Sequence, residues 1–422
     1  MTRVVVAALL LLFSVGSAIG ADTTGFDFRA GLGYDFISQR YFLDSLVGSA
    51  TDTFLQQWAL TTDYVNDFKG ILDFRYKPSG ARGPDFRARY EQTSELARAR
   101  FSSTWRKYGS TASWQGRAEL DWRDRFSGSM HGGDNYLLAS GDLGGRIALQ
   151  EHWAARGKLS GELVNFRGVT GYAYDYYKVT GKLGLERSLG LLSAVAVDGF
   201  VTTRQVADSQ TLSYTSIGGE GSLMGFSGSS EYDLYLRLER KNYDRPDLRD
   251  DYTCLNGSSH LRLDLGGKFL LESNGMVDWL WFNPEDSLNN DYFRGRLWLG
   301  GGMDWQKLTV AVGPEIEVLD DKVKSGLGGE SYFEAGGKLA VDCLLPGKLF
   351  ASVEAATGRR NIEDEADYLS DFTYQRASLL ADWSINPRLS LNLMGAAEWE
   401  WHDQSSDNSR LLLVSSSLTY SF

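Results

Sequence analysis

The chain has 422 residues, of which 42% are hydrophobic and 23% are charged, and its formal net charge at pH 7 is −12. Beyond the N-terminus no apolar run is long enough to cross a membrane as a helix, which argues against a helical membrane protein. A chain of this length could hold two or three soluble domains, but no linker, low-complexity tract or shift in composition divides it. We therefore predict one large domain.

The first twenty residues are predicted to be an export signal. Arg3 provides the positive start, and the apolar run at 4–13 is shorter than the about 20 residues that a membrane-spanning helix needs. Small residues follow at 14–21, and we predict cleavage after Gly20, with cleavage after Ala18 as the alternative. Residues 1–20 would then be the signal peptide and 21–422 the mature domain.

Apolar and polar residues alternate along most of the mature chain. Apolar or small side chains occupy every second position over 112–122, 232–238, 293–303 and 389–401, with charged and polar residues between them. A period of two sustained over about ten residues indicates strands longer than most in soluble proteins. The length suits tilted strands that cross a bilayer, which need about 9 to 11 residues.

Twenty such strands are predicted when the segments are counted back from the C-terminus. They are expected at about 25–38, 52–64, 68–78, 94–106, 111–125, 135–149, 152–167, 174–188, 190–204, 210–223, 229–243, 252–265, 267–281, 291–305, 306–319, 331–344, 347–359, 371–384, 387–401 and 408–422. The region 79–110 is the least regular, because 85–91 could also belong to a strand. Eighteen or twenty-two strands are the alternatives.

The connections between these segments alternate in length. Short ones are predicted at 107–110, 150–152, 266–267, 346–347 and 386–387, and longer ones at about 39–51, 79–93, 126–134, 243–251, 282–290, 321–330 and 361–370. Bacterial outer-membrane barrels have an even number of strands, with short periplasmic turns and longer outer loops. An even count places both ends of the domain in the periplasm.

The final strand carries a recognisable ending. Leu418, Tyr420 and Phe422 share one face with Val414, and the chain stops at the aromatic residue, although Ser416 departs from the pattern. This ending resembles the terminal signal by which bacterial outer-membrane β-barrels are handed to their assembly machinery. The resemblance to such barrels as a class covers nearly all of the mature chain. It implies an all-β fold, a transmembrane antiparallel up-and-down β-barrel of about twenty strands, in the bacterial outer membrane.

A soluble propeller or sandwich is the competing fold. Its strands would be shorter and would bury their apolar face in a core. The 12 Trp, 21 Tyr and 21 Phe beside 47 Gly favour the membrane barrel instead, because aromatic girdles form where its apolar band meets the lipid headgroups. The girdle candidates are Trp105, Trp122, Tyr177, Trp279, Trp281, Trp305, Trp383, Trp399 and Trp401.

Charged residues occupy most of the inward positions in this register, and their signs are unevenly distributed. The predicted basic sector of the pore lining is Arg75, Arg98, Arg100, Arg117 and Arg123, and the predicted acidic sector is Glu315, Glu317, Glu334, Glu354, Glu398 and Glu400. Because charges in a low-dielectric wall focus potential into the gap, the two sectors could produce a field across the lumen, similar to the constriction of general porins. The alternative is that they pair with neighbours, as Arg117 could with Glu119, and merely solvate the wall.

A barrel of this size is wider than the sixteen- to eighteen-stranded porins that already leave an aqueous channel, and no segment is long enough to form a plug domain. We predict a porin-like channel for passive passage of ions or small hydrophilic solutes, with no catalytic residue, metal or cofactor. One alternative is a scaffold barrel around a multihaem cytochrome or an exported polymer, although the chain has no C-x-x-C-H motif of its own. Another is a rim hydrolase that uses His131 or the pair His402-Asp403.

The expected partners are outer-membrane lipid, lipopolysaccharide and the barrel assembly machinery. No nucleic-acid partner is predicted, and a homo-oligomer is left open. The predicted outer loops are acidic, notably over 244–251 and 363–367. Divalent cations that bridge these loops to lipopolysaccharide phosphates would explain the acidity, and so would solvated loops that repel one another.

Overall fold

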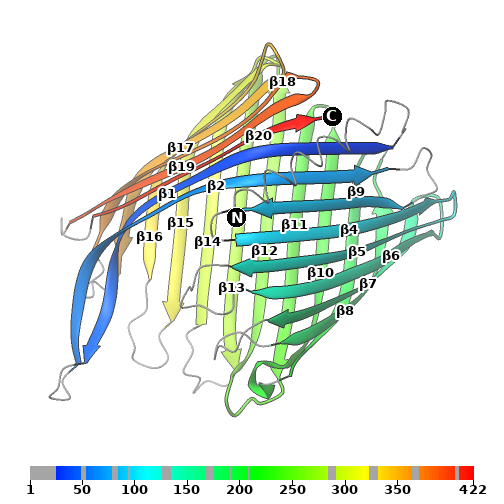
Figure 1. The fold of residues 1–422 in the computed structure, drawn as a ribbon, viewed down its shortest axis with the longest axis horizontal. Coiled ribbons are helices and arrows are strands. Elements are labelled where there is room, and N and C mark those ends of the chain that lie inside the picture. The colour runs from blue at the N-terminus through cyan, green and yellow to red at the C-terminus, as the bar shows by residue number, and fades with distance from the viewer. Residues whose placement is uncertain are drawn as a thin grey trace, which may run out of the picture.

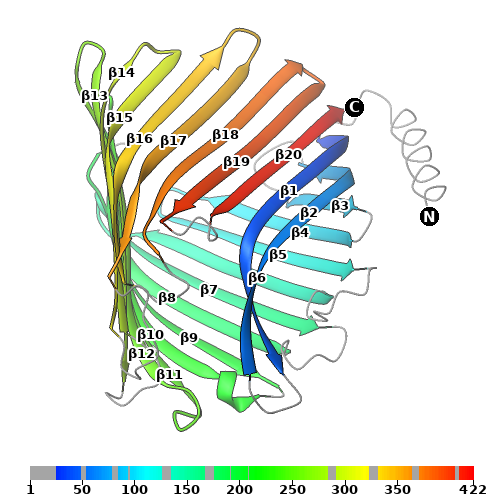
Figure 2. The same cartoon turned by 90° about the vertical axis from the view of Figure 1, so that its left-hand side faces the viewer.

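The computed structural model describes residues 25–48, 54–77, 84–93, 96–125, 135–166, 175–190, 192–207, 209–283, 291–322, 331–363, 370–403 and 408–422. In this part of the chain twenty antiparallel strands follow one another, and β1 pairs with β20, so that the sheet closes into a barrel (Figure 1, Figure 2). The predicted signal peptide lies outside the described residues. The predicted all-β up-and-down barrel is confirmed.

The strand bounds show where the wall begins and ends. They are β1 (Phe26–Gly48), β2 (Phe54–Tyr76), β3 (Asp85–Gln92), β4 (Leu96–Tyr108), β5 (Ala112–Arg125), β6 (Tyr136–Ala148), β7 (Trp153–Phe166), β8 (Tyr176–Ser188), β9 (Ala194–Val206), β10 (Tyr214–Ser227), β11 (Ser230–Tyr243), β12 (Asp251–Gly266), β13 (Phe269–Asn283), β14 (Asp291–Asp304), β15 (Leu308–Lys322), β16 (Tyr332–Leu345), β17 (Leu349–Ile362), β18 (Phe372–Asn386), β19 (Leu389–His402) and β20 (Ser409–Ser421). One short 3-10 turn, η2 (Gln210–Leu212), lies between β9 and β10.

The prediction is accurate from β4 onward and wrong before it. The predicted strands 52–64 and 68–78 are the single strand β2, and β3 lies inside the predicted outer loop 79–93. The polar residues Asn66 and Asp67 fall between the two predicted strands, but they continue the ladder with β1, where Asp35 is opposite Asp67. Similarly, β1 extends through most of the predicted loop 39–51. The total of twenty is correct because one merged strand and one missed strand cancel.

Short turns close the end of the barrel that holds the C-terminus. Gly266 and Gly267 connect β12 to β13 with φ angles of 95° and 70°. Glycine adopts these left-handed angles without the steric cost of a Cβ, which lets two residues reverse the chain. The connection 77–84 belongs to this same end, because Tyr76 lies opposite Phe26 at the start of β1. The chain therefore passes from β2 to β3 at the short-turn end, and not through an outer loop.

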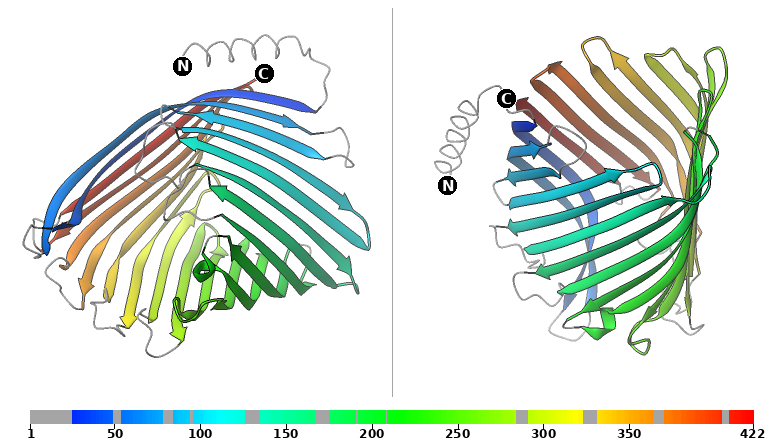
Figure 3. Two further views of the ribbon diagram at one scale, coloured as in Figure 1. Left: turned by 60° about the horizontal axis from the view of Figure 1, so that its bottom comes forward. Right: turned by 90° about the vertical axis from the view of Figure 1, so that its right-hand side faces the viewer.

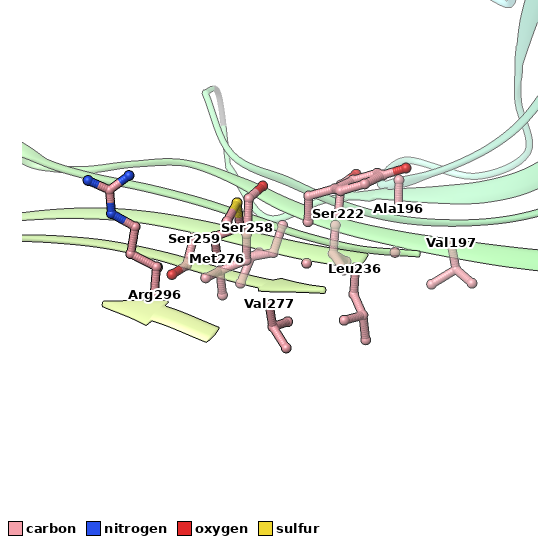
Figure 4. A pocket seen from close by; sticks show the side chains of 16 residues that line it. Ala196, Val197, Ser222, Leu236, Ser258, Ser259, Met276, Val277 and Arg296 are labelled. Carbon is pink, nitrogen blue, oxygen red and sulfur yellow. The ribbon is translucent and has the colours of Figure 1, made fainter. Parts of the chain in front are cut away.

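The outer surface of the barrel is apolar. Alternate residues of each strand point outward, and many are exposed, among them Leu32, Leu143, Leu183, Val197 and Leu236. Figure 4 shows Val197, Leu236 and Val277 on one side of the wall and Ser222 and Arg296 on the other. Within the described residues, no helix is long and apolar enough to cross a bilayer. Water would be a poor solvent for this surface, which fits the apolar interior of a membrane.

Several predicted girdle residues stand near strand ends on this outer surface. Trp105, Tyr177, Trp279 and Trp305 are exposed there, and Trp279 packs against Trp281 with ring centroids 5.1 Å apart. The strands are inclined around the barrel, as Figure 3 shows. Tilted strands with aromatic residues at their ends are typical of membrane barrels, where the rings lie at headgroup level.

At the long-loop end, seven hairpins are closed by a side chain in the same way. A side chain at or just before the start of the second strand accepts a hydrogen bond from a backbone amide near the end of the first strand. The pairs are Phe166 to Asp175, Val206 to Ser213, Tyr243 to Asp251, Phe282 to Asp291, Asp321 to Ser331, Ile362 to Asp371 and His402 to Asn408, at 2.6–2.9 Å. Each bond satisfies an amide that the ladder leaves free.

An aromatic residue follows most of these closing side chains. Tyr176, Tyr214, Tyr252, Tyr292, Tyr332 and Phe372 each stand immediately after one of them, and Tyr136 holds the same place in β6. All of them share the inner face with the charged residues of their strands. We call this set, together with Tyr243 at the end of β11, the tyrosine rim.

Candidate functional site

Every predicted pore-lining residue stands on the inner face of the barrel. The basic sector lies on β2, β4 and β5, and the acidic sector lies on β15 to β19. In the closed order of twenty strands, β4 and β5 are on the opposite half of the barrel from β15 and β16. Arg75 on β2 is only three strands from Glu398 and Glu400 on β19, so the separation holds for the residues of β4 and β5. The structure also supplies both sectors with partners of the other sign.

In the basic sector the arginines pair with acids on neighbouring strands. Arg98 pairs with Asp121, and Arg100 lies 3.3 Å from Glu119. Arg117 also pairs with Glu119, as the pairing alternative predicted. Because these ion pairs neutralise much of the sector, its net charge is smaller than its count of arginines.

Two further members of the basic sector differ from this arrangement. Arg75 lies 2.8 Å from Asp85, so it is paired as well. Arg123 has no carboxylate partner among the described residues and instead lies over the ring of Tyr136, 5.9 Å from its centroid. A guanidinium over an aromatic face is attracted by the ring quadrupole, which is a weaker compensation than an ion pair.

In the acidic sector three glutamates are nearly fully buried. Glu315, Glu317 and Glu334 are 3%, 2% and 2% exposed. Glu315 pairs with Arg296 at 2.8 Å, and Glu317 pairs with Arg294 at 2.8 Å and accepts a hydrogen bond from the Tyr332 hydroxyl at 2.6 Å. Glu334 pairs with Arg360 at 2.7 Å and with Arg376 at 2.8 Å. Burial of three carboxylates is tolerated because each is both paired and hydrogen-bonded.

The remaining members of the acidic sector keep more contact with the lumen. Glu354 is half exposed and lies 2.9 Å from Lys338. Glu398 lies 2.6 Å from Arg376, the same arginine that holds Glu334. Glu400 accepts a hydrogen bond from Ser409. The sector is therefore a connected network rather than a row of free carboxylates.

The arginines of this network were missed by the sequence prediction. Arg294, Arg296, Arg360 and Arg376 stand on β14, β17 and β18, beside or between the glutamates. Cross-strand register would have revealed them, since Arg360 lies opposite Glu334 and Arg376 lies opposite Glu398. The prediction considered each strand by itself, so it could not see that the opposite charge was supplied by the next strand.

A second feature, the depth of the two charges, is shared by both halves of the barrel. The side chain of Arg294 is 41% exposed over Glu317 at 2%, Arg98 is 35% exposed over Asp121 at 6%, and Arg156 is 32% exposed over Asp198 at 6%. The long arginine stem reaches beyond the shorter acid, whose carboxylate remains against the backbone. The lumen therefore meets guanidinium groups first on both sides.

This layering has an electrostatic consequence. Ion pairs whose positive ends point inward form a dipole layer that raises the potential inside the lumen, and the pairs Lys338–Glu354 and Arg376–Glu398, whose acids are the more exposed partners, oppose it. The low dielectric of the wall concentrates that field in the aqueous gap. At the pairs of Arg98, Arg156 and Arg294 the inner wall presents its positive partner to the lumen, even though the whole chain carries a net charge of −12.

A histidine near the rim resembles part of a hydrolase site but lacks its geometry. His402 Nδ1 lies 3.3 Å from the Ser370 hydroxyl, and its Nε2 lies 3.7 Å from Glu400. The second distance is too long for a hydrogen bond, and Ser370 is only 4% exposed. The other predicted rim histidine, His131, lies outside the described residues. In the part of the chain that the structure describes, no group of His, Cys, Asp and Glu could hold a metal ion.

Comparisons with known proteins concern the fold. No protein-family model matches the sequence, and no curated protein is similar to it. Three Pseudomonas aeruginosa structures resemble the barrel. OprD is 13% identical over 95% of this chain and 98% of its own, with a TM-score of 0.46. OpdO is 11% identical over 94% and 97%, with a TM-score of 0.48. The siderophore receptor PirA is 9% identical over 93% and 80%, with a TM-score of 0.51.

At such low sequence identities the comparisons show similarity of fold alone. The superposition on PirA supports a shared barrel fold. The closed antiparallel sheet, the apolar exterior with aromatic residues at strand ends and the charged interior agree with it. The chain is a bacterial outer-membrane β-barrel, porin-like in its architecture.

Proposed function

We propose that the barrel is a passive channel for ions and small hydrophilic solutes. The observation that carries this proposal is the inner wall, which is ionised around its whole circumference and closed by twenty strands. Sixteen- to eighteen-stranded barrels already enclose a water-filled lumen. Every described element except η2 is a strand of the wall. Several charged side chains of the inner wall are about half exposed, so water reaches the lining, and a hydrated lumen is a path for solutes.

The selectivity that we propose follows from the depth of the charges. Guanidinium groups stand nearer the lumen than the carboxylates beneath them, so anions are expected to pass more readily than cations. The transverse field expected from the sequence would be weak where it depends on Glu315, Glu317 and Glu334, because arginines cover all three. Glu354 retains the exposure that such a field needs.

The two alternatives have less support. A scaffold barrel around a cytochrome or polymer would need a partner surface in the lumen, and the ion-paired wall is already satisfied by its own residues. An enzyme would need an accessible nucleophile, whereas Ser370 is buried beside His402. We therefore propose a channel without catalytic activity.

Planar-bilayer recording of the refolded mature chain in a salt gradient tests the channel. Steps of steady conductance with a reversal potential on the anion-selective side are expected. A folded barrel that passes no current would overturn the passive-channel proposal, and cation selectivity would overturn the role of the guanidinium layer while leaving the channel intact.

We also propose that Leu418, Tyr420 and Phe422 are the signal for the assembly machinery. All three share the outer face of β20, where Tyr420 and Phe422 pack with ring centroids 5.0 Å apart. Changing Phe422 to Ser should reduce the amount of heat-modifiable barrel in the outer membrane during expression in cells. Unchanged assembly would remove this role. Lipopolysaccharide, a homo-oligomer and divalent cations at the acidic loops stay predictions.

A further inference from the structure

The tyrosine rim contains cations that are compensated differently from those of the lumen wall. Tyr176, Tyr214 and Tyr252 begin β8, β10 and β12, and Tyr243 ends β11 between the last two. Tyr243 lies 5.8 Å from Tyr214 and 6.3 Å from Tyr252, measured between ring centroids. The rings of Tyr214, Tyr243 and Tyr252 therefore form a continuous aromatic surface on the inner face at the long-loop end, and Tyr176 stands on the same face two strands away.

Two cations rest on these rings. The guanidinium carbon of Arg204 lies 4.1 Å from the centroid of Tyr176. The ammonium of Lys241 lies 4.4 Å from the centroid of Tyr214 and 4.8 Å from that of Tyr252, whose hydroxyl accepts a hydrogen bond from it. Both cations are therefore oriented by aromatic faces, which hold a charge without neutralising it.

Neither cation has a carboxylate partner among the described residues. Glu239 on β11 is already paired with Arg237 at 2.7 Å. Glu162 on the neighbouring strand β7 accepts a hydrogen bond from the Tyr176 hydroxyl and lies opposite Lys178, so one negative charge stands against the three cations here. Arg204 also has a buried Nε without a hydrogen-bond partner. Lys178, which lies opposite Arg204, adds a third positive charge. Positive charge and hydrogen-bond donors are thus left in excess here.

This arrangement contrasts with the wall below it. There, Arg156 and Arg98 each cover a buried acid, and the ion pair largely neutralises the charge of the arginine. At Arg204 and Lys241 the charge remains available to a ligand, at the end of the lumen where the loops are long. A guanidinium and an ammonium together suit an oxyanion, because the guanidinium can donate two parallel hydrogen bonds and the ammonium supplies a point charge.

We propose that Arg204 and Lys241, held by Tyr176, Tyr214 and Tyr252, form a binding site for the oxyanion group of a small solute at the mouth of the lumen. The group would be a phosphate, carboxylate or sulfate. This inference rests on the proposed channel function and gives its substrate class. The site would capture such solutes before they enter the wider part of the lumen, which raises their local concentration.

Inorganic phosphate is the probe that tests this site. Single-channel current is recorded in chloride while phosphate is added, and the half-blocking phosphate concentration is compared between the natural chain and the double variant with Arg204→Gln and Lys241→Gln. Each lost charge-assisted hydrogen bond is expected to weaken binding about tenfold. The half-blocking concentration should therefore rise by at least about tenfold.

The matched control is Arg240→Gln. Arg240 is the neighbour of Lys241 in β11 but points to the outer face, so its variant removes one positive charge beyond the reach of the lumen, as the single variant Lys241→Gln removes one from the site. The Arg240→Gln variant should keep the natural half-blocking concentration. An equal shift in the control would show an effect of net charge alone, and an unchanged double variant would show that the site does not exist.

A second measurement separates this proposal from the channel function. Phosphate binding to the folded barrel in detergent micelles is measured by calorimetry, with heat-modifiable mobility as the check that each variant is folded. A silent channel that binds phosphate through Arg204 and Lys241 would overturn the channel and keep the site. A conducting channel with no phosphate binding would overturn the site and keep the channel.

Discussion

The two halves of the lumen wall show how differently the same residue types can be arranged. On β4 and β5, Arg100 and Arg117 are 41% and 54% exposed and share Glu119, which is 18% exposed. On β15 and β16, Glu317 and Glu334 are 2% exposed beneath arginines from neighbouring strands. The first half holds partly exposed ion pairs beside a single buried acid, Asp121, and the second is a compact network with a buried layer of three glutamates.

The difference arises from the residues around the acids. Tyr332 and Tyr374 pack against the glutamates on β15 and β16, and Tyr374 is completely buried. Tyr374 fits because Gly336 and Gly358 lie beneath its hydroxyl, where an added Cβ would come within 2.7 and 2.5 Å. A carboxylate on the inner face therefore contributes to the lumen only when its neighbours leave it uncovered.

The largest expected effect is on stability and lies in the compact half. Glu334→Gln would remove the charge that holds Arg360 and Arg376. Because two arginines would lose their buried partner, we expect the free energy of unfolding to fall by about 3 to 5 kcal/mol. Urea titration of the refolded barrel measures it. Glu354→Gln is the control, since that half-exposed pair with Lys338 should contribute less than about 1 kcal/mol. Equal losses would mean that the halves do not differ.

A smaller effect is expected from the first half. Arg98→Gln would leave Asp121, which is 6% exposed, with only the weaker contact to Arg100 at 3.4 Å. We expect a loss of about 1 to 3 kcal/mol, the cost of an under-satisfied buried acceptor. Arg117→Gln should cost less than about 1 kcal/mol, because its pair with Glu119 is more exposed. The same urea titration compares them, and a greater loss for Arg117→Gln would reverse the ranking.

The smallest expected effect is on ion selectivity. Arg117 and Glu354 are 54% and 50% exposed, so they are similarly accessible from opposite halves of the lumen. Arg117→Gln should shift the reversal potential toward cation selectivity, and Glu354→Gln should shift it toward anion selectivity by a similar amount. Salt should reduce both shifts, since mobile ions screen exposed charges. Shifts of the same sign in both variants would contradict the assignment of these residues to the lumen surface.

A fourth comparison concerns the closing bonds of the outer hairpins. Asp371→Ala would remove the acceptor of the Ile362 amide and a partner of Arg359. Asp403→Ala would remove only the other partner of Arg359, a fully exposed contact. Loss of the hydrogen bond to the backbone is expected to cost about 0.5 to 1.5 kcal/mol, and the control should be nearly neutral. Hydrogen exchange at Ile362 provides a local measurement, and equal protection in the two variants would exclude the closing role.

Most of the architecture could be predicted from the sequence. The alternation over 112–122 and 389–401 specifies strands whose two faces meet lipid and water, and a one-residue slip would reverse those faces. The prediction failed over 39–93, where polar residues inside β2 resemble a turn and β3 is only 8 residues long. Local pattern alone cannot show that Asp67 continues a ladder with β1, because that partner lies elsewhere in the chain.

The period of two likewise predicted that each of these charged residues stands on the inner face of the wall, but it did not predict how exposed the side chain is. Whether Glu334 or Arg360 meets the lumen depends on side-chain length and on Tyr374 from a third strand, which are properties of packing. The tyrosine rim lies between these cases. Its residues repeat once per hairpin in the sequence, but it is the pairing of the strands that brings them to the same height along the barrel. Alternation is a local property that the chain encodes residue by residue, whereas charge depth arises from contacts between strands, and only the closed barrel brings those together.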